Sequence, residues 1–492
     1  MNSSTTTADP SLAPSAMEAR ETIVSPAEID RSSRAPLLLM FVLAAAWLWI
    51  GSLLGMIASI KMHAPAFLSD VSWLTYGRVR PASTNAFVFG FASQAGMAVA
   101  LWLVARLGRT IVQGVLFIIV GIIAWNVGVA LGVGGVLMGD GTGYEAFEFP
   151  RYASAVLMVA YLIIGAFTLM MFHERRERAL YPSMWYVLAA LCWFPWVYAT
   201  AQFLLVFSTV RGVLQVIVAG WAGHNLMSLW LAPLAVSAAY YFIPKLANRP
   251  LHSRALAIFG FWLLAIFGAH GGIPSGTPAP RWVAAVSDVG IVLGLISILA
   301  VATNLHRTLE RGYARAWNDP GAKFVIVGCG AYVALGLIRA VCVIASVGKP
   351  AGLTLATLGV SQLFLLGFVN LVFAGAIYWI APRLSESLRE PASFVGLNFW
   401  TASVGAALAS GPLIIGGIVQ GQALGSPALN FIDTVRRTIP FMGMATLGAT
   451  LVLVGATILL VNVSRWVCLA CCSCSASDKS VARSVKISGR RA

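Results

Sequence analysis

Charged residues are scarce in this sequence. Only 10% of its 492 residues are Asp, Glu, Lys or Arg, whereas a soluble globular domain usually carries about 25%. The chain is instead 59% hydrophobic, with a mean hydropathy of +0.83. So few charges exclude an ordinary soluble protein, and so much apolar surface excludes a disordered one. We therefore predict an all-α polytopic membrane protein.

Cysteine, histidine and the common catalytic motifs are also scarce. The seven cysteines are too few for a disulfide scaffold, and four of them crowd the last 25 residues. The sequence contains no phosphate-binding glycine loop, no nucleophile elbow and no zinc-protease signature. We therefore assign no catalytic residue from the motifs of soluble enzymes.

Long apolar runs are what the chain does have. Each is long enough to cross about 30 Å of hydrocarbon as a helix. They predict a disordered tail over 1–36, a twelve-helix domain over 37–464 and a basic, cysteine-containing tail over 465–492. The twelve runs are 37–60, 82–106, 111–138, 153–172, 184–208, 213–243, 254–274, 281–305, 322–347, 354–381, 394–420 and 438–464.

The distribution of positive charge predicts how the chain sits in the membrane. The tails and even-numbered loops hold 23 Lys and Arg, the odd-numbered loops hold 9, and Arg339 within a span completes the 33. Because Lys and Arg resist translocation, both termini are expected on the cytoplasmic side of the inner (cytoplasmic) membrane.

Polar side chains inside spans are costly in lipid and are therefore the first candidates for function. His224 lies midway along the sixth predicted span, and His270 lies near the outer end of the seventh. The other four histidines fall at span ends or in loops. Two inward histidines are too few for a haem–copper centre, which needs several imidazole ligands.

Three motifs, spread in order along the chain, resemble subunit I of the haem–copper oxidases, most closely the C-type, cbb-type cytochrome c oxidases. They are residues 76–81 (YGRVRP), residues 223–225 (GHN) with 240–245 (YYFIPK), and residues 375–383 (GAIYWIAPR). The resemblance implies twelve spans with both termini inside, a respiratory complex with other membrane subunits, and oxygen reduction at haem and copper. Its six histidines would ligate a low-spin haem, a high-spin haem and copper.

Most of the ligand set implied by the resemblance is missing. Ser83 stands at the position of the low-spin haem histidine in the second span. In the tenth span the family's His-x-His pair reads Val360 and Gln362. Valine has no ligand atom, and an amide oxygen is a poor ligand for haem iron. We therefore expect no haem unless its ligation is atypical.

The copper positions are better preserved. The resemblance maps two copper ligands onto His224 and His270, with Gly271 in place of a third. The family's crosslinked tyrosine maps near Leu264, and its acid in the ninth span maps near Ile338. Two imidazoles can hold Cu(I), so a residual copper site is one hypothesis; two inherited histidines that hydrogen-bond within the bundle are the simpler one.

Other buried groups suggest structural replacements for cofactors. Arg339 and Asp288 lie at matched depth below the outer face and predict an ion pair. A vacated haem volume is expected to be filled by lipid or by side chains such as Phe364, Phe368 and Trp230, or else to form a solvated path. The amides in spans predict hydrogen bonds between helices; they are Asn126, Asn225, Gln362, Asn370 and Gln420.

The C-terminal tail carries a C-x-x-C spacing within Cys468, Cys471, Cys472 and Cys474. With no histidine or second pair nearby, free thiols or reversible acylation are more natural there than zinc. The basic residues that follow are expected to meet anionic lipid head groups. No nucleic-acid motif accompanies them.

Three functions follow from these observations. The first is a subunit I-like membrane protein without haem or copper catalysis, which acts as a scaffold or partner subunit. The second is an active oxidase or nitric oxide reductase with atypical haem ligands. The third is a proton, ion or copper transporter on the same fold.

Overall fold

The computed structural model describes residues 24–208, 210–273, 277–385 and 392–488, and it describes their side chains as far as Ala470 except at 345, 346, 349, 385, 392 and 393. Across these residues every regular element is a helix. Most of the predicted N-terminal tail, three of the four tail cysteines (Cys471, Cys472 and Cys474) and the final basic side chains lie outside what is described.

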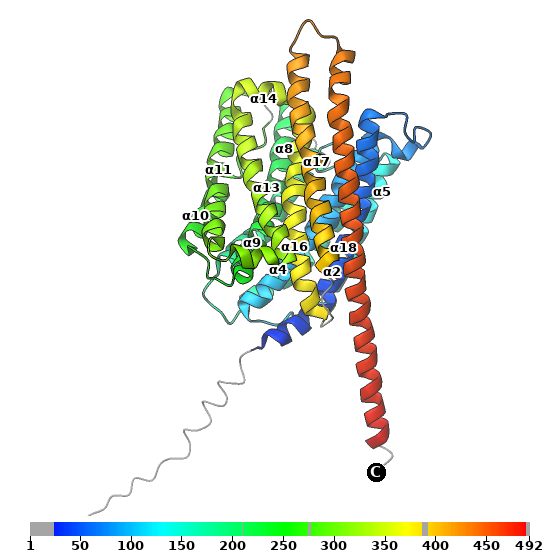
Figure 1. The fold of residues 1–492 in the computed structure, drawn as a ribbon, viewed down its shortest axis with the longest axis vertical. Helices are drawn as coiled ribbons and strands as arrows, with labels where there is room; N and C mark the ends of the chain where they lie inside the picture. Colours follow the sequence, from blue (N-terminus) through cyan, green and yellow to red (C-terminus); the bar gives the residue numbers. More distant parts are fainter. Residues whose placement is uncertain (1–23, 209, 274–276, 386–391, 489–492) are drawn as a thin grey trace, which may run out of the picture.

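The helices form one bundle with short connections (Figure 1). The first half contains α2 (Pro26–His63), η2 (Ser72–Leu74), α3 (Tyr76–Asn85), η3 (Ala86–Ala92), α4 (Ser93–Gly108), α5 (Val115–Met138), α6 (Arg151–His173), α7 (Pro182–Ala201), η4 (Gln202–Phe207), α8 (Val213–Asn225), η5 (Leu226–Leu231) and α9 (Ala232–Ala247). The second half contains α10 (Arg254–Phe267), α11 (Arg281–Leu309), α12 (Tyr313–Asn318), α13 (Pro320–Val343), α14 (Ala345–Ala351), α15 (Leu355–Gln362), η6 (Leu363–Asn370), α16 (Leu371–Ser385), α17 (Ala392–Leu424) and α18 (Phe431–Ser488).

The predicted all-α polytopic membrane fold is confirmed, but the count of twelve spans is not. Eleven helices of the described chain are long and apolar enough to cross a membrane. The predicted span over 254–274 corresponds to α10, which has only 14 residues. At 1.5 Å per residue, α10 is about 21 Å long, which is short of the roughly 30 Å hydrocarbon core.

The first helix begins at Pro26, well before the predicted boundary at residue 37. Ser25 and Glu28 form a capping box that stops fraying at this end. Asp30 then accepts a hydrogen bond from Trp102 Nε1 at 3.2 Å and pairs with Arg106 at 3.6 Å. These contacts hold the start of α2 against the end of α4.

Three continuous helices form the centre of the bundle. They are Tyr76–Gly108, Val213–Ala247 and Leu355–Leu384, whose most apolar stretches are 100%, 94% and 89% buried by the rest of the chain. By contrast, Arg281–Leu309 is only 22% buried on the same measure, because its other faces lie at the periphery. The central helices carry the three family-like motifs.

Each central helix contains a stretch of π-helix: η3, η5 and η6. His224 precedes η5 by two residues, and Gln362 directly precedes η6. A π-helical turn leaves the regular hydrogen-bond ladder and is found frequently at functional sites. A fourth π-helical stretch, η4, lies outside these central helices, so the π-helices adjoin His224 and Gln362 without being confined to candidate positions.

The side chains expected to fill apolar volume are all buried. Trp230 packs at the centre of an aromatic cluster, with its ring centroid 3.9 Å from that of Phe194. Phe368 stacks on Tyr332 at 4.2 Å and contacts Phe364 edge to face.

Several of the predicted interhelical amide bonds are confirmed. Asn126 exchanges hydrogen bonds with Gln94 and accepts another from Trp47 Nε1 at 2.9 Å. The Gln420 side chain accepts a bond from the backbone N–H of Leu355 at 2.9 Å, which ties α17 to α15. These polar groups hold apolar helices in a fixed register.

Candidate functional site

His224 is held at both ring nitrogens. Its Nε2 lies 2.9 Å from the carbonyl oxygen of Gly268, and its Nδ1 lies 3.1 Å from Arg339 Nη2. Because a guanidinium can only donate, Nδ1 must accept and Nε2 must carry the ring hydrogen that is donated to Gly268. Both nitrogens therefore have partners within the chain, and the single in-plane lone pair of the neutral ring, on Nδ1, already accepts a hydrogen bond from Arg339.

Arg339 joins this site instead of the ion pair predicted with Asp288. No ion pair among the described residues includes either side chain, so that prediction is wrong. The sequence gives the depth of a residue along its helix but not the rotation of that helix. Asp288 is half-buried on the peripheral α11, whereas Arg339 reaches His224 of the central helix α8.

Side chains of the same site donate hydrogen bonds to the backbone carbonyls just after the end of the short helix α10. Ser228 Oγ donates to the Gly268 carbonyl at 3.2 Å, alongside His224, and Asn225 Nδ2 donates to Ala269 O at 3.1 Å. Non-helical backbone at membrane depth is tolerated only where protein groups satisfy it. The polar side chains of α8 and η5 thus allow α10 to stop after 14 residues. Sequence analysis missed Ser228, which differs little from many serines in apolar helices.

His270 is placed differently from its predicted copper partner. Its side chain is exposed, and the structure gives it no contact with the His224 ring. Gly271 lies against that ring, because a Cβ built there would be 2.7 Å from His224 Nε2. The position predicted for a third copper ligand therefore has no room for a side chain while His224 keeps its hydrogen bonds. The copper pair remains a prediction that would require this network to open.

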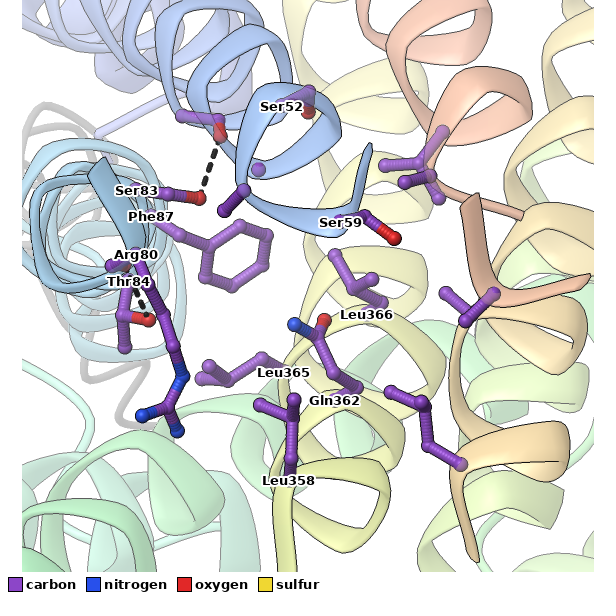
Figure 2. A pocket seen from close by; sticks show the side chains of 18 of the residues that line it. Ser52, Ser59, Arg80, Ser83, Thr84, Phe87, Leu358, Gln362, Leu365 and Leu366 are labelled. Atoms are coloured by element: carbon purple, nitrogen blue, oxygen red, sulfur yellow. Dashed lines mark hydrogen bonds between the residues drawn. The ribbon is translucent and has the colours of Figure 1, made fainter. Parts of the chain in front are cut away.

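Ser83 and Gln362 are brought to one cavity (Figure 2). It lies between α2, α3, α15, α17 and α18 and has a volume of about 80 Å³. Ser83 Oγ donates to the Gly51 carbonyl at 2.7 Å, so its hydroxyl is used within the chain. Val360, the remaining ligand position, is not part of the lining.

The residues present do not fit the haem and copper groups that the resemblance implies. Sites for large organic ligands usually measure 300–1,000 Å³, several times this cavity. The two facing groups are a hydroxyl and an amide, and neither supplies the nitrogen or sulfur ligand that haem iron takes in most proteins. The described residues contain no group of three or more His, Cys, Asp or Glu that could hold a metal.

A buried acid that contacts helix α3 was missed by sequence analysis. Glu148 lies in the loop between α5 and α6, is 9% exposed, and accepts a hydrogen bond from Asn85 Nδ2 at 2.7 Å. Burial raises the pKa of Glu148 from 4.5 to about 7, although the bond from Asn85 opposes the shift. Asn85 Oδ1 is buried with no partner in the described structure, so a protonated Glu148 would be a suitable neighbour for it.

Comparison with known proteins shows which family the chain resembles over most of its length. The family model of cytochrome c and quinol oxidase polypeptide I matches residues 35–451. A cytochrome c oxidase subunit 1 homolog from Azorhizobium caulinodans is 28% identical, with 87% of this chain and 81% of the relative covered. A cbb3-type cytochrome c oxidase subunit, CcoN1, from Stutzerimonas stutzeri is 25% identical, with 87% and 93% covered.

The fold agrees with these matches. A chain of a heme-copper terminal oxidase dimer, solved by cryo-electron microscopy, superposes with a TM-score of 0.68 at 15% identity. The superposition covers 88% of this chain and 84% of the oxidase chain. The family match spans most of the sequence and includes all three central helices. This protein therefore belongs to the cytochrome c and quinol oxidase polypeptide I family.

Proposed function

We propose that this chain is a non-catalytic member of its family, a membrane subunit that acts as a scaffold or partner in a respiratory complex. One observation carries the proposal: both ring nitrogens of His224, the family-like histidine on a central helix, are hydrogen-bonded within the chain. A ligand must offer a free lone pair to a metal, and this imidazole instead joins Arg339 to the end of α10.

The other ligand positions support the same proposal. Ser83 donates its hydroxyl to Gly51, and Gln362 offers an amide to a cavity of about 80 Å³. The relatives are oxidase subunits by name, so a place beside other membrane subunits is the property most readily retained. We further propose the inner membrane as its location, with anionic lipid at the basic tail and both termini on the cytoplasmic side. This orientation requires the short helix α10 and the backbone that follows it to complete a twelfth crossing beside the eleven long helices.

Metal analysis of the purified protein tests the proposal. The full chain is purified from haem-sufficient, copper-replete cells, and haem and copper are quantified per chain beside a reduced-minus-oxidised absorbance spectrum. We expect far less than one haem or copper per chain, and co-purification with other membrane subunits after mild crosslinking.

Stoichiometric haem would overturn the proposal and favour an active oxidase with atypical ligands. Stoichiometric copper that disappears in His224→Ala but persists in His270→Ala would assign a copper site to the central helix. Copper that moves across vesicles containing the purified protein would favour a transporter.

A further inference from the structure

A second and larger cavity lies at the end of the bundle where the even-numbered loops meet. It has a volume of about 780 Å³, which is within the usual range for small-molecule sites. Its lining comes from the end of α4, the loop between α6 and α7, and the turn between α9 and α10. Figure 1 shows the ends of α4, α9 and α10 on the side of the bundle where α2 begins.

The lining is strongly basic. It contains five cations and a single carboxylate, Glu177; the cations are Arg106, Arg109, Lys245, Arg249 and Arg254. Glu177 forms an ion pair with Arg109 at 3.6 Å. Arg106 forms an ion pair, also at 3.6 Å, with Asp30, which lies outside the lining.

Three of the cations remain without a carboxylate. The ion pairs of the described residues leave out Lys245, Arg249 and Arg254, and all three side chains are exposed. Like charges gathered around one cavity repel each other, and the repulsion is relieved when an anion occupies the space between them. We call these three residues the basic triad.

The backbone around the cavity adds donors for an anion. Tyr181 caps the N-terminus of α7 without a side-chain hydrogen bond, although the first residue of α7, Pro182, has no N–H to donate. Arg254 is the first residue of α10, where the Ser253 side chain accepts from Leu256 N–H and leaves the N–H groups before it unused by the cap. Helix N-termini direct unpaired N–H groups and a positive dipole end outward, which favours anions. The C-terminus of α9 has the opposite sign, but Lys245 lies in its last turn and offsets it.

We propose that this cavity binds a phosphate-bearing anion through the basic triad. Arginine forks and a lysine ammonium are the groups that proteins use most for phosphate, because they donate several charge-assisted hydrogen bonds at once. The phosphate can belong to the head group of an anionic lipid or to a soluble compound, and both carry the same chemistry. The inference is independent of the proposed loss of haem and copper.

Binding is measured on the full chain in phosphatidylcholine nanodiscs, with inorganic pyrophosphate titrated by calorimetry. A parallel sample, extracted gently from native membranes, is analysed by native mass spectrometry for retained phosphatidylglycerol and cardiolipin. The triad variant carries Lys245→Gln, Arg249→Gln and Arg254→Gln. The matched control carries Arg178→Gln, Arg311→Gln and Arg315→Gln, which removes the same charge from cations outside the lining.

We expect the triad variant to weaken binding by at least about tenfold, because each charge-assisted hydrogen bond contributes that order of affinity. The control should stay within about twofold, since diffuse surface charge alone changes little at physiological salt. A third variant, Lys245→Arg with Arg249→Lys and Arg254→Lys, keeps the charge and should bind within a few fold of the wild type.

The two samples distinguish the sources of phosphate. Pyrophosphate binding that is lost only in the triad variant supports a soluble ligand. Anionic lipid that is retained by the wild type and the control but lost by the triad variant supports a lipid head group. Equal behaviour of the triad and control variants in both samples overturns the proposal.

Discussion

The two regions where the family resemblance predicts metal ligands differ in how completely their polar groups are satisfied. Around His224 the interior is closed, because each ring nitrogen has a partner and the carbonyls at the end of α10 are satisfied. Around Ser83 and Gln362 a cavity of about 80 Å³ remains, and the Ser52 hydroxyl in its wall is buried with no partner in the described structure. His224 is thus part of the hydrogen-bonded framework, whereas open space remains beside Ser83 and Gln362.

Because its polar groups are paired, the His224 region should lose more unfolding free energy on substitution than the region around Ser83 and Gln362. His224→Ala should lower the free energy of unfolding by about 2–4 kcal/mol, because Arg339 and the Gly268 carbonyl each lose a buried partner. Denaturant titration of the detergent-solubilised protein measures the loss. His270→Ala, at an exposed side chain, should change it by less than about 0.5 kcal/mol.

A double variant measures how much of the stability loss comes from leaving either His224 or Arg339 without its partner. His224→Leu combined with Arg339→Met removes both members together, so its cost should be clearly smaller than the sum of the two single changes. Equal stability losses for His224→Ala and His270→Ala would contradict the view that the hydrogen bonds of His224 stabilise its region.

Glu148, in the loop between α5 and α6, is expected to make the stability of the fold depend on pH. Its pKa is raised to about 7 in the folded chain, so between pH 4.5 and pH 7 the folded chain keeps a proton that the unfolded chain releases. The stabilisation from this group is therefore greatest below pH 4.5, falls as pH rises, and is gone above pH 7. The full change is about 3 kcal/mol, from 1.36 kcal/mol per pKa unit.

Unfolding curves of single variants across this pH range test that slope. Glu148→Gln should remove it, whereas Glu145→Gln, which replaces an exposed acid in the same loop, should leave it in place. A slope that survives in Glu148→Gln would assign the pH dependence to another group.

Gly271 tests how tightly the His224 region is closed. Gly271→Ala places a Cβ 2.7 Å from His224 Nε2, so the ring must move and the unfolding free energy should fall by about 1–3 kcal/mol. Gly294→Ala, in helix α11 with nothing within 4 Å of the added Cβ, should be neutral or slightly stabilising. The melting temperatures of the two variants measure these effects. Equal changes in both would contradict the prediction that the His224 region is tightly packed.

The smallest effects are expected in the cavity wall. Ser83→Ala removes the 2.7 Å bond to the Gly51 carbonyl and should cost about 1 kcal/mol. Ser52→Ala, in the same wall, removes a hydroxyl without a partner and should cost nothing or stabilise the chain slightly. Thermal unfolding of both variants decides this, and an equal cost would mean that the Ser83 bond contributes no net stability.

The architecture was predictable because membrane helices leave a strong hydropathy signal. The apolar runs located eleven of the spans, and the motifs located the three central helices. The end of α10 was not predictable, because the apolar run continues past Phe267 and only the glycines after it suggest a break. Its early end depends on side chains of another helix.

The contacts of individual side chains were harder to predict than the positions of those residues along the helices. The depth of Arg339 was correct, but its partner depends on helix rotation, which hydropathy does not encode. Glu148 was missed because its burial arises from the packing of a loop against α3, and the sequence gives an acid between two phenylalanines no special pattern. The basic cavity likewise joins residues from three distant loops.

The short helix α10 has a consequence for how the protein is made. Fourteen residues insert weakly as an independent segment, and the carbonyl at their end is satisfied by His224, which in turn depends on Arg339. Synthesis reaches Arg339 about seventy residues after α10 ends, and at roughly 5–20 residues per second this is a wait of several seconds. During that interval the nascent chain holds a short segment whose end lacks its final hydrogen-bond partners, so we expect this segment to depend on the insertion machinery until Arg339 is made.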